Sequence, residues 1–368
     1  MKKSTFVKTL LSTSLILVAG NSFADGFKRF SVSAGWLHVM PQGKANPFNI
    51  NTAVANGQKA TVGEVSPDGF LNSLDPNATI KEGDKEANLK ETVSSLLNSP
   101  FGSLILNKET GNVSAKNTGT ATLNGLDAWQ AGGTGLEADD VDTLGLMFNY
   151  YINDNVSLQM IAGLPPKVDI NGKGEIVAPM SGTAFPGGLA GSLFPELALK
   201  QDIPITNLGN KSKAATVRAW TPAIEAQYQF GKSGVNKFRP YVGAGLMYSH
   251  FSNIKLNGQV RDDLIAAGHM IQNISDDQAG AALDGKTSSA NPFVKVKTTD
   301  AIAPIVSVGA TYDFTENWYA VASVSYAKLN NQAKIDVIDA NTGKRLIHST
   351  TKVDIDPLIT YLGVGYRF

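Results

Sequence analysis

The chain has no cysteine and, after its first residues, no long apolar run, and each absence excludes a class of protein. Without cysteine there is no disulfide, no thiolate nucleophile and no sulfur ligand for a metal. No later segment approaches the roughly 18 consecutive apolar residues of a transmembrane helix, which excludes a helical membrane protein. The 32 basic and 32 acidic residues balance, so no net charge draws the chain to nucleic acid.

The first 24 residues predict an export signal. Lys2, Lys3 and Lys8 make the start basic, residues 10–20 are apolar, and residues 22–24 (Ser-Phe-Ala) form a small-x-small cleavage site. Residues 25–368 are then expected to be one exported domain. An exported soluble protein and an outer-membrane β-barrel remain as possibilities.

Two-residue alternation recurs along the rest of the chain and predicts strands between two different environments. The last eleven residues, LITYLGVGYRF, show it most clearly, because rings and aliphatic side chains occupy one face while glycine and arginine lie on the other. The predicted strands cover residues 27–40, 143–152, 156–164, 223–230, 238–248, 306–314, 318–326 and 358–368.

The connections between these strands alternate in length, which favours a membrane barrel. Polar excursions at about 41–140, 171–215 and 257–292 alternate with short turns, as long external loops alternate with short periplasmic turns in outer-membrane barrels. We therefore predict an all-β fold, an eight-stranded antiparallel transmembrane β-barrel with long extracellular loops and both termini in the periplasm. The expected location is the outer membrane of a Gram-negative cell, and one set of rings would form the periplasmic girdle: Phe230, Phe238, Phe314, Trp318, Tyr366 and Phe368.

The excursions carry weaker signals. Leu89, Val93 and Leu97 have helical spacing, which predicts a short helix over about 84–98, and residues 264–271 repeat that spacing. The Asn, Thr and Gly content of the first excursion otherwise indicates flexible, solvated chain.

Three segments resemble the OmpW family of small outer-membrane proteins. They are LGLMFNYYINDNVSLQMIAGLPPKV (144–168), FRPYVGAGLMY (238–248) and DPLITYLGVGYRF (356–368). The likeness covers the predicted strands and not the three excursions, which are longer than usual for the family. It implies passive uptake of small hydrophobic molecules, an apolar constriction in the lumen, and a lateral exit bounded by a proline in the third strand.

The expected transport path follows from strand parity and from this resemblance. Ile161 matches an aliphatic lumen position of the family, Ser325 stands where the family has an aromatic, and Glu225 stands where it has an apolar residue. An eight-stranded barrel is only wide enough for side chains, so a solute must pass small residues or leave through the wall. Small lumen residues are equally well explained as relief of crowding. The predicted path residues are Leu37, Met147, Tyr151, Ile161, Met247 and Ser325.

Three prolines mark a candidate weak seam. Pro165 and Pro166 fall near the outer end of the third strand and Pro222 at the start of the fourth, and proline lacks the N–H that a ladder needs. The hypothesis is that an apolar solute leaves sideways here. The alternative is that pairing has already ended and the prolines only begin loops.

The charged lumen residues are expected to be structural. Glu225, Arg239, Asp313 and Arg367 face inward by parity, which predicts an ion-pair plug towards the periplasmic end. Such a plug requires no cofactor and no catalytic chemistry.

Enzyme activity is not expected, and neither is a cofactor. His38, His250, His269 and His348, the last placed near the start of the eighth strand, show no triad or metal-ligand spacing. The carboxylates of residues 139 and 140 are expected to be solvated.

Two functions follow as hypotheses. The first is a porin-like conduit for small hydrophobic or amphipathic solutes. The alternative is a surface-binding protein that the barrel anchors and that acts through its long loops. The expected partners are outer-membrane lipids and, through the C-terminal strand, the barrel assembly machinery.

Overall fold

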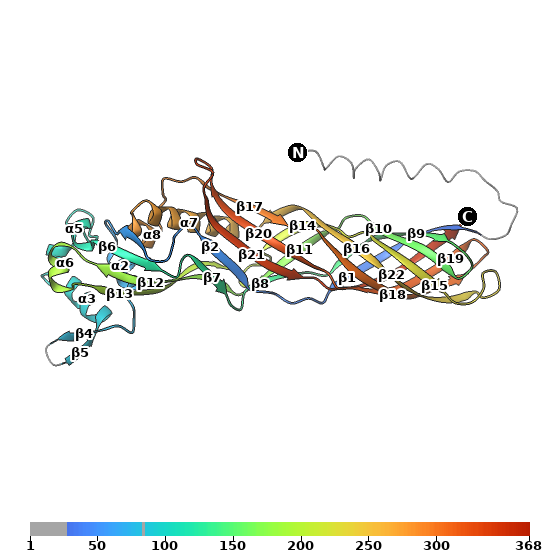
Figure 1. The fold of residues 1–368 in the computed structure, drawn as a ribbon, viewed down its shortest axis with the longest axis horizontal. Coiled ribbons are helices and arrows are strands. Elements are labelled where there is room, and N and C mark those ends of the chain that lie inside the picture. The colour runs from blue at the N-terminus through green and yellow to red at the C-terminus, as the bar shows by residue number, and fades with distance from the viewer. Residues whose placement is uncertain (1–27, 83–84) are drawn as a thin grey trace.

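The computed structural model describes residues 28–82 and 85–368 (Figure 1). The predicted export signal and residue 27 lie outside these residues. Within them, eight strands close into an antiparallel barrel, because β22 pairs with β1 and β15 pairs with β16. The barrel strands are β1 (Phe30–Pro41), β9 (Val141–Tyr151), β10 (Val156–Gly163), β15 (Ala223–Gln229), β16 (Phe238–Leu256), β18 (Ala301–Asp313), β19 (Trp318–Ala327) and β22 (Pro357–Arg367). All eight predicted strands are confirmed.

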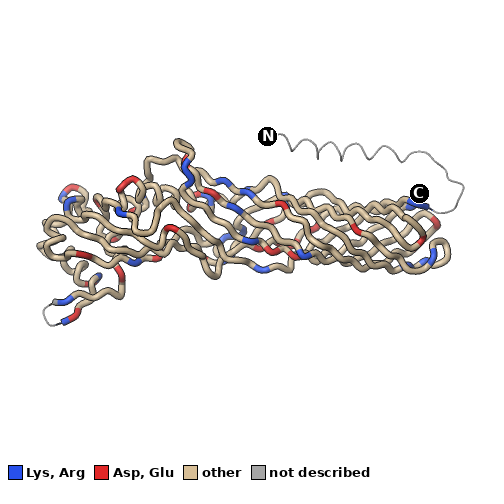
Figure 2. The backbone as a smooth tube through the Cα atoms, in the orientation of Figure 1, with Lys and Arg blue, Asp and Glu red and all other residues tan. Residues whose placement is uncertain are grey.

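The barrel wall is apolar outside and polar inside. Val308 is 57% exposed and Leu362 58% exposed on the outer face, whereas the inward Ser307 is 5% exposed. Charged residues are sparse along the barrel wall and gather at its ends and in the rest of the molecule (Figure 2). This distribution is the reverse of that in a soluble protein and matches a barrel surrounded by lipid.

Aromatic rings collect at the end of the barrel that carries the short turns, which we call the turn end. Tyr366 contacts Trp318 and Phe368, with ring centroids 5.0 and 5.2 Å apart. Phe30 and Phe368 meet there too, since the amide of Phe368 donates to the carbonyl of Phe30. The predicted girdle residues therefore lie together at one rim.

The long excursions fold into a cap at the other end (Figure 1). One barrel strand, β16, runs on past its predicted end at residue 248 and pairs with the cap strand β14. The barrel sheet therefore continues into the cap in the order β16-β14-β11-β8. A second cap sheet has the order β17-β20-β21-β2-β7. The added strands are β2 (Phe48–Thr52), β7 (Ala128–Ala131), β8 (Gly135–Ala138), β11 (Lys167–Lys173), β14 (Ala215–Trp220), β17 (Pro292–Thr298), β20 (Asn330–Asp339) and β21 (Arg345–Asp354).

The distal part of the cap holds a third sheet, a hairpin and short helices. The third sheet has the order β13-β12-β6-β3, and β4 pairs with β5. The elements are β3 (Gln58–Thr61), β4 (Thr79–Glu82), β5 (Lys85–Asn88), β6 (Thr120–Asn124), β12 (Glu175–Phe185), β13 (Leu197–Asn207), α2 (Pro67–Ser73), α3 (Leu89–Leu97), α4 (Gly102–Ile105), α5 (Ala115–Thr118), α6 (Gly188–Leu193), α7 (Gly258–Ser275) and α8 (Ala279–Leu283).

The cap has its own hydrophobic core, so the prediction of a flexible first excursion is wrong. Val65, Leu74 and Leu126 from that excursion are at most 1% exposed and pack in one cluster with Ile271 of the last excursion and Val337 of β20. Alternation did not reveal this because the contributing strands are short, many of four or five residues.

The helix predicted over about 84–98 is shorter than expected. Residues 85–88 form β5, and α3 begins at Leu89 because Asn88 caps it, accepting a hydrogen bond from the amide of Glu91. The helical spacing at 264–271 corresponds to α7, which Asn257 caps. Among the described residues, no helix has the length and apolar character needed to cross a membrane.

Candidate functional site

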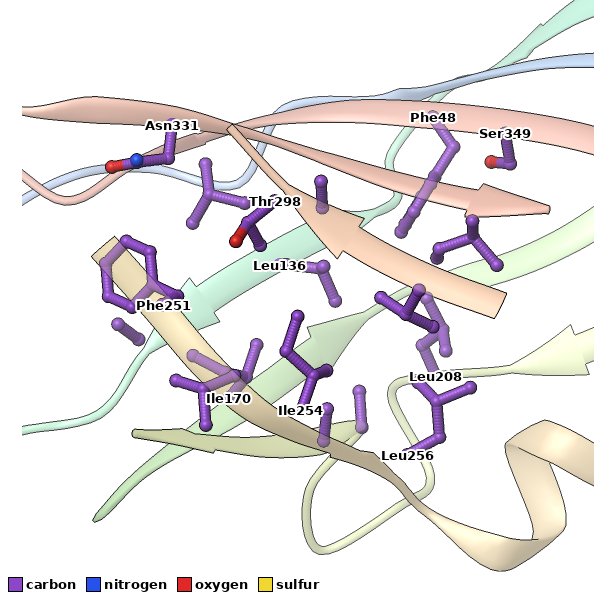
Figure 3. A pocket seen from close by; sticks show the side chains of 18 of the residues that line it. Phe48, Leu136, Ile170, Leu208, Phe251, Ile254, Leu256, Thr298, Asn331 and Ser349 are labelled. Carbon is purple, nitrogen blue, oxygen red and sulfur yellow. The ribbon is translucent and has the colours of Figure 1, made fainter. Parts of the chain in front are cut away.

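An apolar cavity lies where the cap meets the barrel. It is lined by residues of the extended barrel sheet, of the second and third cap sheets and of α7, and its volume is about 160 Å³. Figure 3 shows side chains from β16 (Phe251, Ile254) and from β8 and β11 (Leu136, Ile170) directed into the same space. Phe48 of β2 closes it on the opposite side.

The lining is almost free of charge. Asp139 is its one charged residue, and no Lys, Arg or His contributes to it among the described residues. Thr206 and Asn331 add polar atoms that other protein groups already occupy, since Thr206 donates to Asp263 and Asn331 donates to Ser249. The cavity therefore suits an uncharged apolar molecule, because an unpaired buried charge is costly.

An apolar layer inside the barrel adjoins the cavity through Met247, which lines the cavity wall. Met147, Ile161, Ala223 and Met247 lie opposite one another in a row across β9, β10, β15 and β16. All four are at most 8% exposed, and Leu37 belongs to the same cluster. Of the predicted path residues, the structure thus brings Leu37, Met147, Ile161 and Met247 together.

The other two predicted path residues lie apart from this layer. Ser325 pairs with Ile359 at the level of the cavity, whereas Tyr151 pairs with Ser157 near the turn end. Both are buried in the lumen, at 4% and 5% exposure.

Tyrosine rings cover the lumen glycines below the apolar layer. A Cβ added at Gly309 would lie 2.6 Å from Cζ of Tyr241, and one at Gly363 would lie 2.5 Å from the hydroxyl of Tyr361. These glycines therefore make room for rings, as glycine–aromatic pairs do in other sheets. The small lumen residues do not enclose an open passage at these positions.

Hydrogen bonds tie the polar lumen side chains to one another. Gln227 donates to Gln159 at 2.8 Å, and Gln229 donates to Thr311 at 2.7 Å. The hydroxyls of Tyr319 and Tyr361 donate to Ser31 and Ser33, each at 3.0 Å. We call this layer the lumen plug, and it separates the cavity from the turn end.

The four predicted ion-pair residues separate into three arrangements. Arg367 and Asp313 pair at 2.6 Å, and the Arg367 guanidinium also lies 4.3 Å from the Tyr319 ring centroid. Arg239 is 3.7 Å from Asp154 of a turn, a partner that strand parity did not identify, and also donates to that residue's carbonyl. Glu225 has no cationic partner among the residues that the structure describes, and it accepts a hydrogen bond from Ser307 at 2.6 Å. A single four-residue network is therefore not formed.

The predicted prolines interrupt the wall beside the cavity. The β10–β15 ladder ends at Ile161–Ala223, and the β11–β14 ladder of the same seam begins at Lys167–Arg218. Between these ladders the amide of Ala219 donates to the carbonyl of Pro166, and Arg218 donates to that of Pro165. Pro222 lies on the opposite strand just before β15 and accepts from the amide of Tyr248.

The segment between β10 and β11 also lacks ladder pairing on its other side, where it faces β9 and β8. The sequence analysis did not identify this second gap. The ladder with β9 ends at Gly163–Gly145, followed by one further bond from the amide of Leu164 to the carbonyl of Leu144. The ladder with β8 begins at Ile170–Ala138, preceded by a bond from the amide of Asp139 to the carbonyl of Asp169. Successive strand residues direct their backbone groups to opposite neighbours, so adjacent prolines remove one donor from each side. Val141 and Pro166, which flank this second gap, both line the cavity.

The histidines take part in carboxylate pairs. His38 and Trp36 bond to Asp142, each at 2.8 Å, and near the same rim His250 and Tyr248 bond to Asp300 in the same way. The hydrogen bond with His250 is the largest cause that lowers the pKa of Asp300 below its usual value, and the bond with Tyr248 is the next. The two clusters lie at the outer surface between barrel and cap.

The other two histidines lie in the cap. His269 contacts Ser288 from α7, and His348 pairs with Asp336. His348 is in β21 rather than near the start of the eighth strand, because a cap hairpin precedes β22. Asp139 and Asp140 are exposed, and no group of three His, Asp or Glu residues in the described chain could hold a metal.

Comparisons with known proteins agree with this architecture. The OmpW family matches residues 101–284 and 281–368. Outer membrane protein W of Vibrio cholerae is 25% identical over 226 residues, covering 61% of this chain and 73% of that protein. Outer membrane protein W of Escherichia coli is 24% identical over 255 residues, covering 68% and 85%. The matched family residues include seven of the eight barrel strands.

Among solved structures, OprG of Pseudomonas aeruginosa has a TM-score of 0.49 at 15% identity, over 93% of this chain and 96% of that one. AlkL has a TM-score of 0.37 at 12% identity, over 95% of each chain. The sequence relatives are named as outer membrane proteins, and the barrel described above has the apolar outer face that this location requires. The chain belongs to the OmpW family and is an outer-membrane β-barrel protein.

Proposed function

We propose that the protein is a passive conduit through which small, mainly hydrophobic molecules enter the outer membrane from outside the cell. The cap faces the exterior, the turn end faces the periplasm, and the apolar cavity is the entry site. One observation carries the proposal: an almost uncharged cavity lies directly above a hydrogen-bonded lumen plug and beside a gap in the wall.

The plug argues against an axial route. An apolar solute moving down the barrel would have to break buried hydrogen bonds such as Gln227–Gln159 and Tyr361–Ser33, without replacing them. Each buried polar group left unpaired costs roughly 1–3 kcal/mol. A sideways exit into lipid avoids this cost and transfers the solute from one apolar environment to another.

The exit is the proline interruption. Pro165 and Pro166 lie in the segment between β10 and β11 that has no ladder pairing to β9. On the side that faces β15, Pro222 limits the pairing. Leu164, the residue before these prolines, is 61% exposed on the outer face. A solute leaving here passes from the apolar cavity wall to lipid through a seam with few hydrogen bonds.

Restoring the ladder tests the exit. Pro165→Thr combined with Pro166→Val supplies two N–H donors, and two hydrogen bonds of about 1 kcal/mol each would lower the population of the open seam about 30-fold. We expect the flux of an apolar solute into proteoliposomes to fall accordingly. Wild-type flux should be higher for the apolar solute than for a charged one of the same size.

The matched control is Pro240→Thr, because Pro240 lies in β16 near the turn end, away from the cavity. This variant should transport the apolar solute at the wild-type rate. Undiminished flux in the Pro165/Pro166 variant, with the barrel intact, would count against the lateral route.

A second function, surface binding through the cap, is favoured by one feature. Phe101 and Leu104 are 64% and 63% exposed, and Leu193 of α6 is 48% exposed, all at the distal tip of the cap. Asn117 links these helices, since it donates to the carbonyl of Leu104 and accepts from the amide of Leu189. Grouped exposed apolar side chains often mark interaction sites.

Replacing Phe101 and Leu104 with serine separates the two functions. The conduit predicts unchanged solute flux, because the tip is remote from the cavity lining. Loss of attachment of intact cells to octadecyl-coated beads, with normal flux, would support the binding function.

A further inference from the structure

Two buried hydrogen-bonding atoms on the cavity wall have no partner among the described residues. They are Oγ of Ser349 and Nε1 of Trp129. Ser349 is only 7% exposed, and Trp129 packs against the cap core. Buried polar atoms are nearly always paired in native proteins, because an unpaired one loses its hydrogen bonds to water without replacement. These atoms therefore indicate where a bound molecule would supply a hydrogen bond.

Both atoms belong to one row of side chains across a cap sheet. Ile50 of β2 lies opposite Ser349 of β21 on one side and opposite Trp129 of β7 on the other. Ile335 of β20 lies opposite Ser349 in turn. Residues directly opposite in an antiparallel sheet project to the same face, and all four line the cavity. Figure 3 shows Ser349 beside Phe48 at this wall.

The chemistry of the two atoms restricts the ligand. An indole N–H only donates, and a serine hydroxyl can donate, so the bound molecule must present a hydrogen-bond acceptor, such as a carbonyl oxygen. A carboxylate is disfavoured because none of the described residues that line the cavity is cationic. The volume of about 160 Å³ is close to that of an engineered cavity of about 150 Å³ that binds benzene, so the ligand is of that size.

We infer that the cavity selects small neutral apolar molecules that carry a hydrogen-bond acceptor such as a carbonyl oxygen, with Trp129 and Ser349 as the donors available to it on either side of β2. This inference rests on the proposed function, because it names the solute class of the same cavity. It goes further in assigning specificity to two side chains that lie outside the barrel.

Binding of three matched probes to the full-length protein in lipid nanodiscs tests the inference. Cyclohexanone carries the acceptor, methylcyclohexane has a similar shape without it, and cyclohexanecarboxylate adds a charge. We expect cyclohexanone to bind more tightly than the other two and to shift the indole N–H resonance of Trp129. Trp129→Phe should weaken cyclohexanone binding about three- to tenfold, the loss expected for one neutral hydrogen bond, and leave methylcyclohexane binding unchanged.

Ser349→Ala provides a second test that removes only a hydroxyl group, and Trp220→Phe is the control because Trp220 does not line the cavity. Ser349→Ala should also reduce the preference for cyclohexanone over methylcyclohexane. Equal binding of these two probes by the wild type, or an unchanged preference in both variants, would overturn the inference. Binding requires no exit, so a failed Pro165/Pro166 flux test would leave this result standing.

Discussion

The buried charges of the barrel depend on individual partners. Arg367 is 4% exposed by side chain and Asp313 13%, and each is held by the other at the turn end. The face of the Tyr319 ring adds a second favourable contact to the guanidinium. Removing one partner would leave the other charge buried and uncompensated.

Asp313→Ala is therefore expected to destabilise the barrel by about 3–5 kcal/mol, the usual cost of breaking a buried ion pair from one side. Unfolding by denaturant in detergent micelles measures the change. The double variant Asp313→Ala with Arg367→Met should recover much of the loss, and Asp140→Ala, at an exposed site, should have little effect. A loss as large in the double variant as in the single one would contradict this account.

Among the elements, the β20–β21 hairpin joins the cap to the last barrel strand. At its turn the Asp339 carboxylate accepts hydrogen bonds from the hydroxyl of Thr342 at 2.6 Å and from the amides of Asn291 and Asn341. The Thr342 bond contributes most to lowering the pKa of Asp339, followed by that of Asn291. The same carboxylate thus connects the turn to the residue that precedes β17.

This lowered pKa predicts acid sensitivity of the hairpin. A carboxyl group whose pKa is lower in the folded state contributes stability that is complete above its unfolded pKa, about 3.9, and is lost as pH falls through the folded value. Amide hydrogen exchange at Asn291 and Asn341 should therefore show weaker protection as pH falls below about 4. Asp339→Asn should remove that pH-dependent component, and identical pH profiles in the two proteins would contradict the prediction.

At the scale of the whole molecule, the cap and barrel are joined through continuous strands and one apolar cavity, while the lumen plug closes the barrel below. The barrel thus carries the cap, and the gap lies where the barrel wall meets the cap. We expect the wild-type protein to show no steady ion conductance in planar bilayers.

Opening the plug should change this. Tyr241→Ala with Tyr319→Ala removes two large lumen side chains, both at most 4% exposed, and leaves space that water can fill. We expect ion conductance to appear in this variant while binding of apolar probes in the cap is retained. Steady conductance of the wild type, or none in the variant, would show that these rings do not close the lumen.

How far the sequence predicts the site can be judged from single residues. Two-residue alternation, which is a local pattern, predicts that Arg367 and Asp313 share the inward face, and in the structure they pair at 2.6 Å. It could not identify Asp154 as the neighbour of Arg239, because that carboxylate reaches in from a turn. Nor could it find Trp129 and Ser349, whose shared position depends on Ile50 pairing with both.

By itself, the sequence determined the barrel. Lipid requires apolar side chains on one face of each strand and the lumen accepts polar or small ones on the other, so the alternation can be recognised within a single strand. Only the tertiary structure decided the cap and its cavity. The cap sheets pair segments as distant as Asn49 and Thr350, and the strands of the first excursion, of four or five residues each, are too short to show a periodic pattern. Burial in the cap comes from packing between excursions, which no excursion specifies alone.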